Sequence, residues 1–191
     1  MKIDTYPVVL ASLLLPLFLL LFSYSLVLEL YPVTAEQQRV LQYLAGKEAL
    51  PLNYTAAEQA HLGDVVEVMS RAKAIFYLSF LGLAALFIYS SKSRELLQKM
   101  LHYGGLSSLG CLFLLLVGIS FGFSRAFALF HQVFFPQGNW MFAADSLLIR
   151  TFPAEFFVKI STAIFILAFI LGSLFILLSV YLKHGHTNKW N

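Results

Sequence analysis

Two histidines, His61 and His131, are the side chains of this sequence best suited to acid–base chemistry. An imidazole changes its charge near neutral pH, so it can both accept and donate a proton. Asp64 follows His61 by three residues, so the two side chains share one face if the segment is helical. A neighbouring carboxylate can fix the tautomer of the ring and raise its basicity. A lone exposed histidine is more often simply solvated, and spacing alone leaves both interpretations open.

The segment at about 131–157 surrounds His131 with aromatic and ionisable side chains. Trp140 and Asp145 are the members that we consider as supporting or substrate-binding residues. The default interpretation of such an aromatic segment is a belt at the membrane interface. The presence of a histidine and a carboxylate within it also allows a reactive site, and we keep both interpretations.

Arg125 lies within the long apolar block that ends near His131, about one and a half turns from its end. An ionisable residue inside a span indicates a functional site by default, although near an end it can also snorkel to the interface. Ser124 precedes His131 by seven residues, which allows a Ser–His pair on one helix. Nearly two turns of helix separate those two residues, which disfavours a nucleophilic pair.

The composition requires a membrane around these residues, because 59% of the 191 residues are hydrophobic and only 12% are charged. That charge content is about half of what a soluble domain carries. Each long apolar block can cross the hydrocarbon core of about 30 Å as a helix, the form that satisfies the backbone in lipid. We therefore predict an all-α polytopic membrane protein of one domain, residues 1–191. Its four transmembrane helices are expected at about 6–28, 72–91, 104–130 and 158–182.

Four spans place both termini on one side, and the distribution of basic residues favours the cytoplasm for that side. The basic residues are denser in the two termini and the 92–103 loop than in the longer segments opposite, although Arg71 and Lys73 oppose this orientation. The two structured external segments, about 29–71 and 131–157, then carry both histidines to the outer face. The first block has a weak basic start and a long apolar run, which favours an uncleaved anchor over a signal peptide.

The first external segment contains two helix starts. Thr34 with Gln37 forms a capping box, which predicts the start of a short helix, and Gly46 is a residue that can end it. This helix is amphipathic and lies either on the membrane surface or only on its own protein. Thr55 with Glu58 forms a second capping box, which opens a helix that can continue into the second span.

The external residues resemble the lipoprotein intramolecular transacylase family, called Lit. The resemblance rests on NYTAAEQAHLGDV, at 53–65, and on FHQVFFPQGNWMF followed by DSLLIRTFPAEFF, between 130 and 157. It extends over the whole chain in hydropathy. The resemblance implies transfer of the sn-2 acyl chain of a diacylglyceryl-cysteine lipoprotein to its own α-amine. It also implies that the essential histidines of the family correspond to His61 and His131.

We expect further that diacylated lipoproteins and membrane lipid are the partners, in the bacterial cytoplasmic membrane, with a monomeric enzyme and no cofactor, metal or nucleic acid. The net charge of +3 is too small to indicate nucleic acid. We favour His61, held by Asp64, as the base, His131 as the proton donor and Arg125 as the oxyanion partner. Tyr54 joins the supporting residues.

Two other functions remain open from the residues. Paired histidines in a four-helix membrane bundle can bind haem b, although both histidines here lie near the ends of spans. A non-catalytic accessory subunit could use the aromatic segments to contact a partner.

Overall fold

The computed structural model describes residues 5–51 and 53–187, and within these ranges the chain forms helices joined by turns. Seven helices follow one another along the described chain. They are α1 (Thr5–Leu30), α2 (Ala35–Leu44), α3 (Ala56–Ser90), α4 (Arg94–Ser120), α5 (Phe123–Phe134), α6 (Leu147–Thr151) and α7 (Ala154–Thr187).

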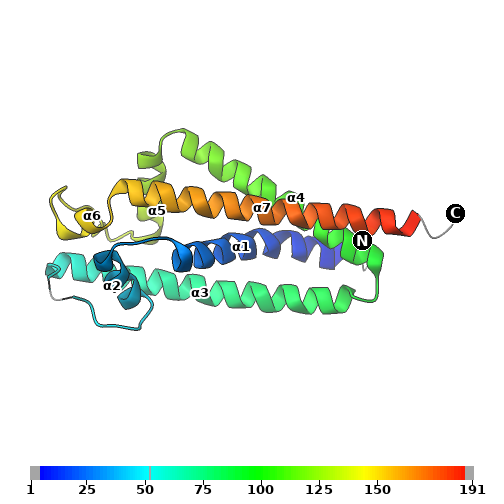
Figure 1. Ribbon diagram of the computed structural model, residues 1–191, viewed down its shortest axis with the longest axis horizontal. Coiled ribbons are helices and arrows are strands. Elements are labelled where there is room, and N and C mark those ends of the chain that lie inside the picture. Colours follow the sequence, from blue (N-terminus) through cyan, green and yellow to red (C-terminus); the bar gives the residue numbers. More distant parts are fainter. Residues whose placement is uncertain (1–4, 52, 188–191) are drawn as a thin grey trace.

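Four of these helices, α1, α3, α4 and α7, are long and apolar enough to cross a membrane. They run side by side along the long axis of the molecule, and the three short helices gather at one end (Figure 1). Large apolar side chains on the long helices face outward, as at Leu78, Leu114 and Leu177. Lipid must cover this surface, so the predicted all-α multi-pass membrane fold is confirmed.

Glycines on α4 let the neighbouring spans approach closely. A Cβ atom at Gly105 would lie 2.7 Å from the Ile176 side chain and 3.0 Å from the carbonyl of Gly172 on α7. A Cβ atom at Gly104 would lie 2.8 Å from Leu15 on α1. Small residues at such contacts are typical of helix packing in membranes, where close van der Waals contact replaces the hydrophobic effect.

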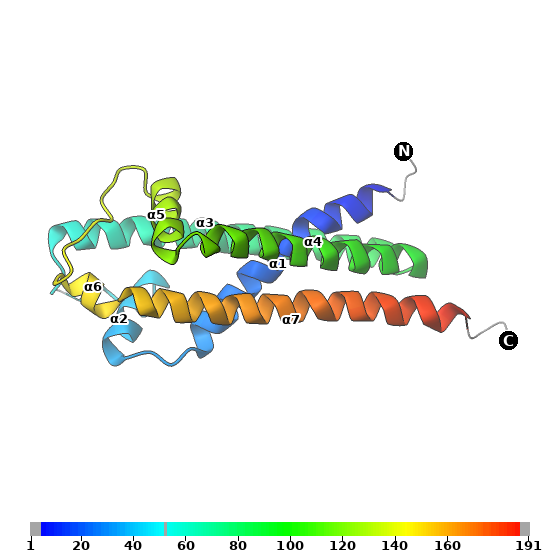
Figure 2. The ribbon, with the colours of Figure 1, turned by 90° about the horizontal axis from the view of Figure 1, so that it is seen from above.

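The third apolar block differs from the sequence prediction of one helix over about 104–130. The structure divides the block: α4 ends at Ser120, and α5 starts at Phe123. Gly122 lies between them with φ 117°, a backbone conformation that favours glycine. Figures 1 and 2 both show α5 turned across the long axis of the bundle. His131 therefore lies on a separate helix rather than at the end of a span.

The second capping box forms as predicted. Thr55 accepts a hydrogen bond from the Glu58 backbone, and Glu58 accepts one from the Thr55 backbone. The helix that starts here runs without interruption to Ser90, through the predicted second span. His61 is therefore fixed on the same helix as that span.

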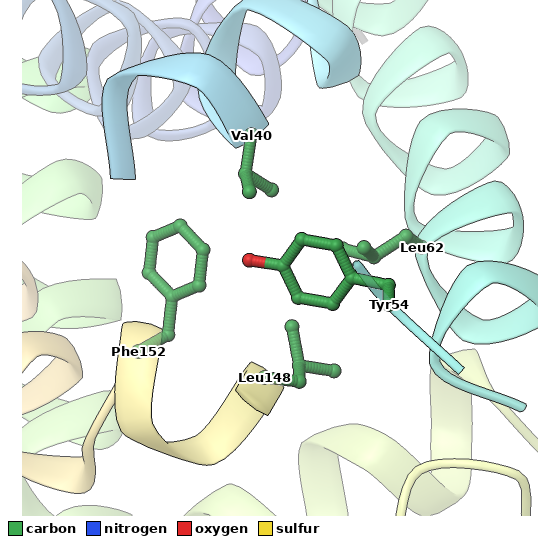
Figure 3. Packing of buried hydrophobic residues seen from close by; sticks show 5 residues of the cluster. All are labelled: Val40, Tyr54, Leu62, Leu148 and Phe152. Atoms are coloured by element: carbon green, nitrogen blue, oxygen red, sulfur yellow. The ribbon is translucent and has the colours of Figure 1, made fainter. Parts of the chain in front are cut away.

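A hydrophobic cluster joins the two external segments (Figure 3). Its buried members come from α2, the following loop, α3 and α6, and are Val40, Tyr54, Leu62, Leu148 and Phe152. Val40 is fully buried, so this face of α2 packs on its own protein. The Thr34–Gln37 capping box and the positive φ of 73° at Gly46 delimit α2 as predicted.

Candidate active site

The rings of His61 and His131 lie side by side at the end of the bundle that carries the short helices. Their centroids are 6.1 Å apart, and their planes differ by 28°. His61 comes from the first helical turns of α3, and His131 comes from α5. Both are buried, with exposed fractions of 6% and 9%. Two imidazoles that are distant in sequence are thus close enough for one substrate group to contact both.

Aromatic rings enclose the pair. The ring of Phe135 lies 4.8 Å from that of His61 and 5.4 Å from that of His131. Trp140 lies 5.0 Å from His131, and Phe142 lies 5.7 Å from His61. The predicted supporting residue Trp140 therefore contacts the site directly. Such surroundings exclude water, which strengthens every electrostatic interaction between the groups that they enclose.

A hydrogen bond fixes the tautomer of His131. Its Nδ1 lies 2.8 Å from the carbonyl oxygen of Phe127, one turn earlier on α5. A carbonyl oxygen only accepts, so Nδ1 carries the proton and Nε2 holds the lone pair of the neutral ring. Burial lowers the pKa of His131 below the ordinary value of 6.5, and the bond to Phe127 acts in the opposite direction. His131 is thus neutral at pH 7 and presents one acceptor nitrogen.

His61 has a different environment. Its Nδ1 is buried and has no hydrogen-bond partner in the described part of the chain. The expected partner Asp64 instead accepts hydrogen bonds at Oδ2 from Gln137, at 2.8 Å, and from Asn139, at 2.5 Å. Asp64 therefore holds the second external segment against α3. Sequence spacing placed Asp64 on the face of His61 but could not show the two amides that engage it.

Glu58 makes a connection that the sequence did not reveal. Its carboxylate is 1% exposed and accepts from the Thr55 backbone nitrogen and hydroxyl at one oxygen, at 2.8 and 2.9 Å. The other oxygen accepts from the backbone nitrogen of Leu148, in α6, at 2.8 Å. The capping box indicated only the first of these roles. Burial of a carboxylate requires such complete pairing, and here the pairing ties α6 to the start of α3.

Tyr54 supports the architecture around the site. Its hydroxyl lies 3.1 Å from the Thr151 hydroxyl, and its ring is buried in the cluster of Figure 3. Burial raises the pKa of this hydroxyl above the ordinary value of 10.0. Gln37 also donates to the carbonyl of Thr151 at 2.8 Å, so α2, the loop before α3 and α6 meet at one residue.

In the described part of the chain, no hydrogen bond or ion pair connects the side chains of Arg125 and Asp145 to the site. Both are exposed, and within residues 5–51 and 53–184 neither side chain makes a hydrogen bond or ion pair. Arg125 precedes His131 by six residues on α5, and at roughly 100° per residue the two side chains point to different faces. The oxyanion role that the sequence favoured for Arg125 has no support in this geometry.

Among the residues that the structure describes, no group of three His, Cys, Asp or Glu side chains is arranged to hold a metal ion.

Comparison with known proteins gives one family and one relative. The family model described as "Lipoprotein intramolecular transacylase Lit" matches residues 23–157, which include both histidines. An uncharacterised protein of Aquifex aeolicus is 30% identical over 122 residues, which cover 63% of this chain and 54% of that protein. The chain thus spans about half the length of this curated relative.

Solved structures share the fold. The membrane integral lipoprotein intramolecular transacylase Lit from Bacillus cereus matches with a TM-score of 0.84 at 18% identity, over 96% of this chain and 97% of that one. A variant of the same protein with one histidine changed to arginine matches with a TM-score of 0.81 at 19% identity, over 97% and 94% of the two chains.

Proposed function

The chain belongs to the lipoprotein intramolecular transacylase family, and we propose that it transfers an acyl chain within a diacylglyceryl-cysteine lipoprotein. The chain leaves the sn-2 oxygen of the glyceryl group and joins the free α-amine of the same cysteine. The product is a lyso-form lipoprotein with an N-acylated cysteine. Donor and acceptor belong to one molecule, so the reaction needs no coenzyme.

The proposal depends chiefly on the pairing of His61 and His131, whose ring centroids are 6.1 Å apart in a buried aromatic enclosure. Aminolysis of an ester requires removal of a proton from the amine and delivery of a proton to the alcohol that leaves. Two adjacent imidazoles supply one acceptor and one donor for these transfers. A lipid substrate can present both reacting groups to them at the membrane boundary.

The reaction balances without an added reactant. A bond forms between the amine nitrogen and the ester carbonyl carbon, and the bond between that carbon and the sn-2 oxygen breaks. One proton leaves the amine, and one proton reaches the glyceryl oxygen. Binding one substrate in a near-attack geometry supplies much of the acceleration, because the two reacting groups are already tethered.

The tautomer of His131 supports its assignment as the base. Its Nδ1 is engaged with Phe127, so the neutral ring offers Nε2 to the amine proton. His61 then contacts the ester oxygens or the leaving glyceryl oxygen, which reverses the roles that the sequence favoured. The same two residues also serve a variant in which the acyl chain passes through a covalent acyl-histidine. Arg125 has no part in either version.

The position of the pair agrees with a substrate held in the outer leaflet. The two elements that carry the histidines, α5 and the start of α3, lie at the end of the bundle opposite to the start of α1 and the end of α7 (Figure 1). Together with the density of basic residues near the termini and in the 92–103 loop, this arrangement supports a reaction on the extracytoplasmic face.

The function is tested by expressing the wild type and the variants His61→Gln, His131→Gln and His184→Gln in a bacterium that lacks its own transacylase of this kind. His184 is exposed on α7 at the far end of the bundle and serves as the matched control. Mass spectrometry of lipoprotein N-terminal peptides reads the product directly. We expect lyso-form product from the wild type and the control, and its loss from both site variants. Product at the wild-type level from both site variants would reject the histidine mechanism, and no product from the wild type would reject the function.

A further inference from the structure

Asn139 carries a polar atom that the site does not use. Its Oδ1 is buried and has no hydrogen-bond partner among the described residues. A buried carbonyl oxygen without a donor is unfavourable, because it has given up its bonds to water. Such an atom in a native protein calls for an explanation, and a ligand that donates a hydrogen bond is one.

The orientation of the Asn139 amide follows from its neighbour. Nδ2 donates to Oδ2 of Asp64 at 2.5 Å, and the same oxygen accepts from Gln137 at 2.8 Å. Exchange of the amide nitrogen and oxygen would place two acceptors against each other at that distance, which is unfavourable. Asp64 therefore fixes the side chain so that Oδ1, an acceptor, is the atom without a partner.

Asn139 is also linked to both histidine-bearing helices. Its partner Asp64 follows His61 by one turn on α3. Its neighbour in sequence, Trp140, has its ring 5.0 Å from the ring of His131. The side chain that carries the unpaired Oδ1 is therefore bonded to the helix of His61, and the next residue in sequence packs on His131.

The chemistry of the proposed substrate identifies a donor. The diacylglyceryl group offers ester oxygens and a thioether sulfur, which accept hydrogen bonds and do not donate them. The N-terminal amine is the group next to the reacting ester that carries N–H donors. An acceptor built into the enzyme at this place is complementary to the amine and not to the ester.

We propose that Oδ1 of Asn139 binds an N–H of the substrate α-amine and orients it for acyl transfer. This inference rests on the proposed function. A neutral primary amine has two N–H groups and one lone pair. With one N–H on Asn139 and the other on Nε2 of His131, the lone pair remains for the ester carbon. Asn139 is a substrate-binding residue in this scheme, and Asp64 is a positioning residue that orients the Asn139 amide.

The test is a binding cycle with two unreactive analogues of the diacylglyceryl-cysteine peptide, both with ether links in place of esters. One keeps the α-amine, and the other has hydrogen in its place. Dissociation constants are measured for the wild type and Asn139→Ala in lipid nanodiscs. One hydrogen bond corresponds to about a five- to tenfold preference of the wild type for the amine analogue. We expect Asn139→Ala to bind the amine analogue more weakly and the other unchanged, so that the preference falls to about one.

Gln137→Ala is the matched control, because it removes the other amide on Asp64 and leaves the Asn139 carbonyl in place. We expect it to keep the wild-type preference. Equal loss of affinity for both analogues in Asn139→Ala, with the preference retained, would mean a structural role only and would overturn the proposal. Asn139→Leu, which keeps the shape of the side chain, repeats the measurement if Asn139→Ala does not fold.

The wild type alone can also decide the question. If it binds both analogues equally, no acceptor in the site recognises the amine, and the proposal is wrong. Failure of the wild type to produce lyso-form lipoprotein would instead reject the proposed function. Lyso-form product from the wild type, together with an unchanged amine preference in Asn139→Ala, would reject the role of Asn139 alone.

Discussion

The Glu58 carboxylate accepts a hydrogen bond from the backbone nitrogen of Leu148 at 2.8 Å, across 90 residues of sequence. The contact joins the helix of His61 to the second external segment. Glu58 lies about one turn before His61 on α3, and within the described residues its carboxylate makes no hydrogen bond to either imidazole. The stability of the site and the stability of this end of the bundle are therefore coupled.

Glu58→Gln should destabilise this end of the protein. A glutamine keeps the shape but offers one acceptor oxygen, so a donor on Thr55 or Leu148 loses its partner. The expected loss is about 1–3 kcal/mol of unfolding free energy. Thermal denaturation in detergent measures it, and Glu155→Gln, at an exposed ion pair of 4.0 Å with Lys159, is the control. A melting temperature equal to that of the control would contradict the buried role of Glu58.

His131 should titrate below the ordinary histidine value. Burial lowers its pKa from 6.5, because the charged ring is poorly solvated. The ring is therefore mainly neutral at pH 7, and the midpoint of its protonation lies below 6.5. Imidazole resonances in nitrogen NMR, assigned by comparison with His131→Gln, report the midpoint directly. Acyl transfer should lose its base over the same acidic range, and a midpoint above 6.5 would be inconsistent with this account.

Gly122→Ala should reduce activity by displacing α5. The residue has φ 117°, where an alanine is strained by about 1–3 kcal/mol. No atom lies within 4 Å of a Cβ at this position, so the effect comes from the backbone alone. Gly118→Ala is the control, because its Cβ also meets open space but it lies inside helix α4. Acyl transfer and melting temperature should both fall in Gly122→Ala and stay at the wild-type level in Gly118→Ala. Equal behaviour of the two variants would contradict a need for glycine at the break between α4 and α5.

Phe135→Ala should impair catalysis more than binding. Phe135 is buried, and its ring contacts both imidazoles. Its removal lets the rings shift and admits water, which we expect to lower the turnover rate by about tenfold or more, since small displacements of reacting groups are costly. Phe134→Ala, at an exposed neighbouring position, should retain the wild-type rate. A rise in KM with an unchanged turnover rate in Phe135→Ala would argue against this role.

Local signals in the sequence predicted the helix starts correctly. The capping boxes at Thr34 and Thr55 depend on residues three positions apart, so they can be read without knowledge of the fold. The number of spans was equally accessible, because lipid imposes a length and a composition on each of them, whereas the bounds of the third span were predicted wrongly. The proximity of the two histidines was predicted from their position on the same membrane face, although His131 lies on α5 and not at the end of a span.

Tertiary contacts could not be predicted from these local signals. Asp64 was expected to pair with His61, its neighbour on one helix face, yet it is engaged by amides more than 70 residues away. The break at Gly122 was hidden because hydropathy is continuous across it. The exposed position of Arg125 follows from that break, since α5 is turned away from the axis of α4.

The unbroken course of α3 has a mechanical consequence. A helix of 35 residues is about 52 Å long, well beyond the roughly 30 Å of a hydrocarbon core, so its outer turns stand clear of the lipid tails. A change in bilayer thickness changes the tilt of such a helix, and His61 near its outer end moves with it. The hydrogen bonds of Asp64 to Gln137 and Asn139, and of Glu58 to Leu148, tie the second external segment to the same helix. The rings of His61 and His131 should therefore move together, and their alignment should hold in phospholipids of different acyl-chain length.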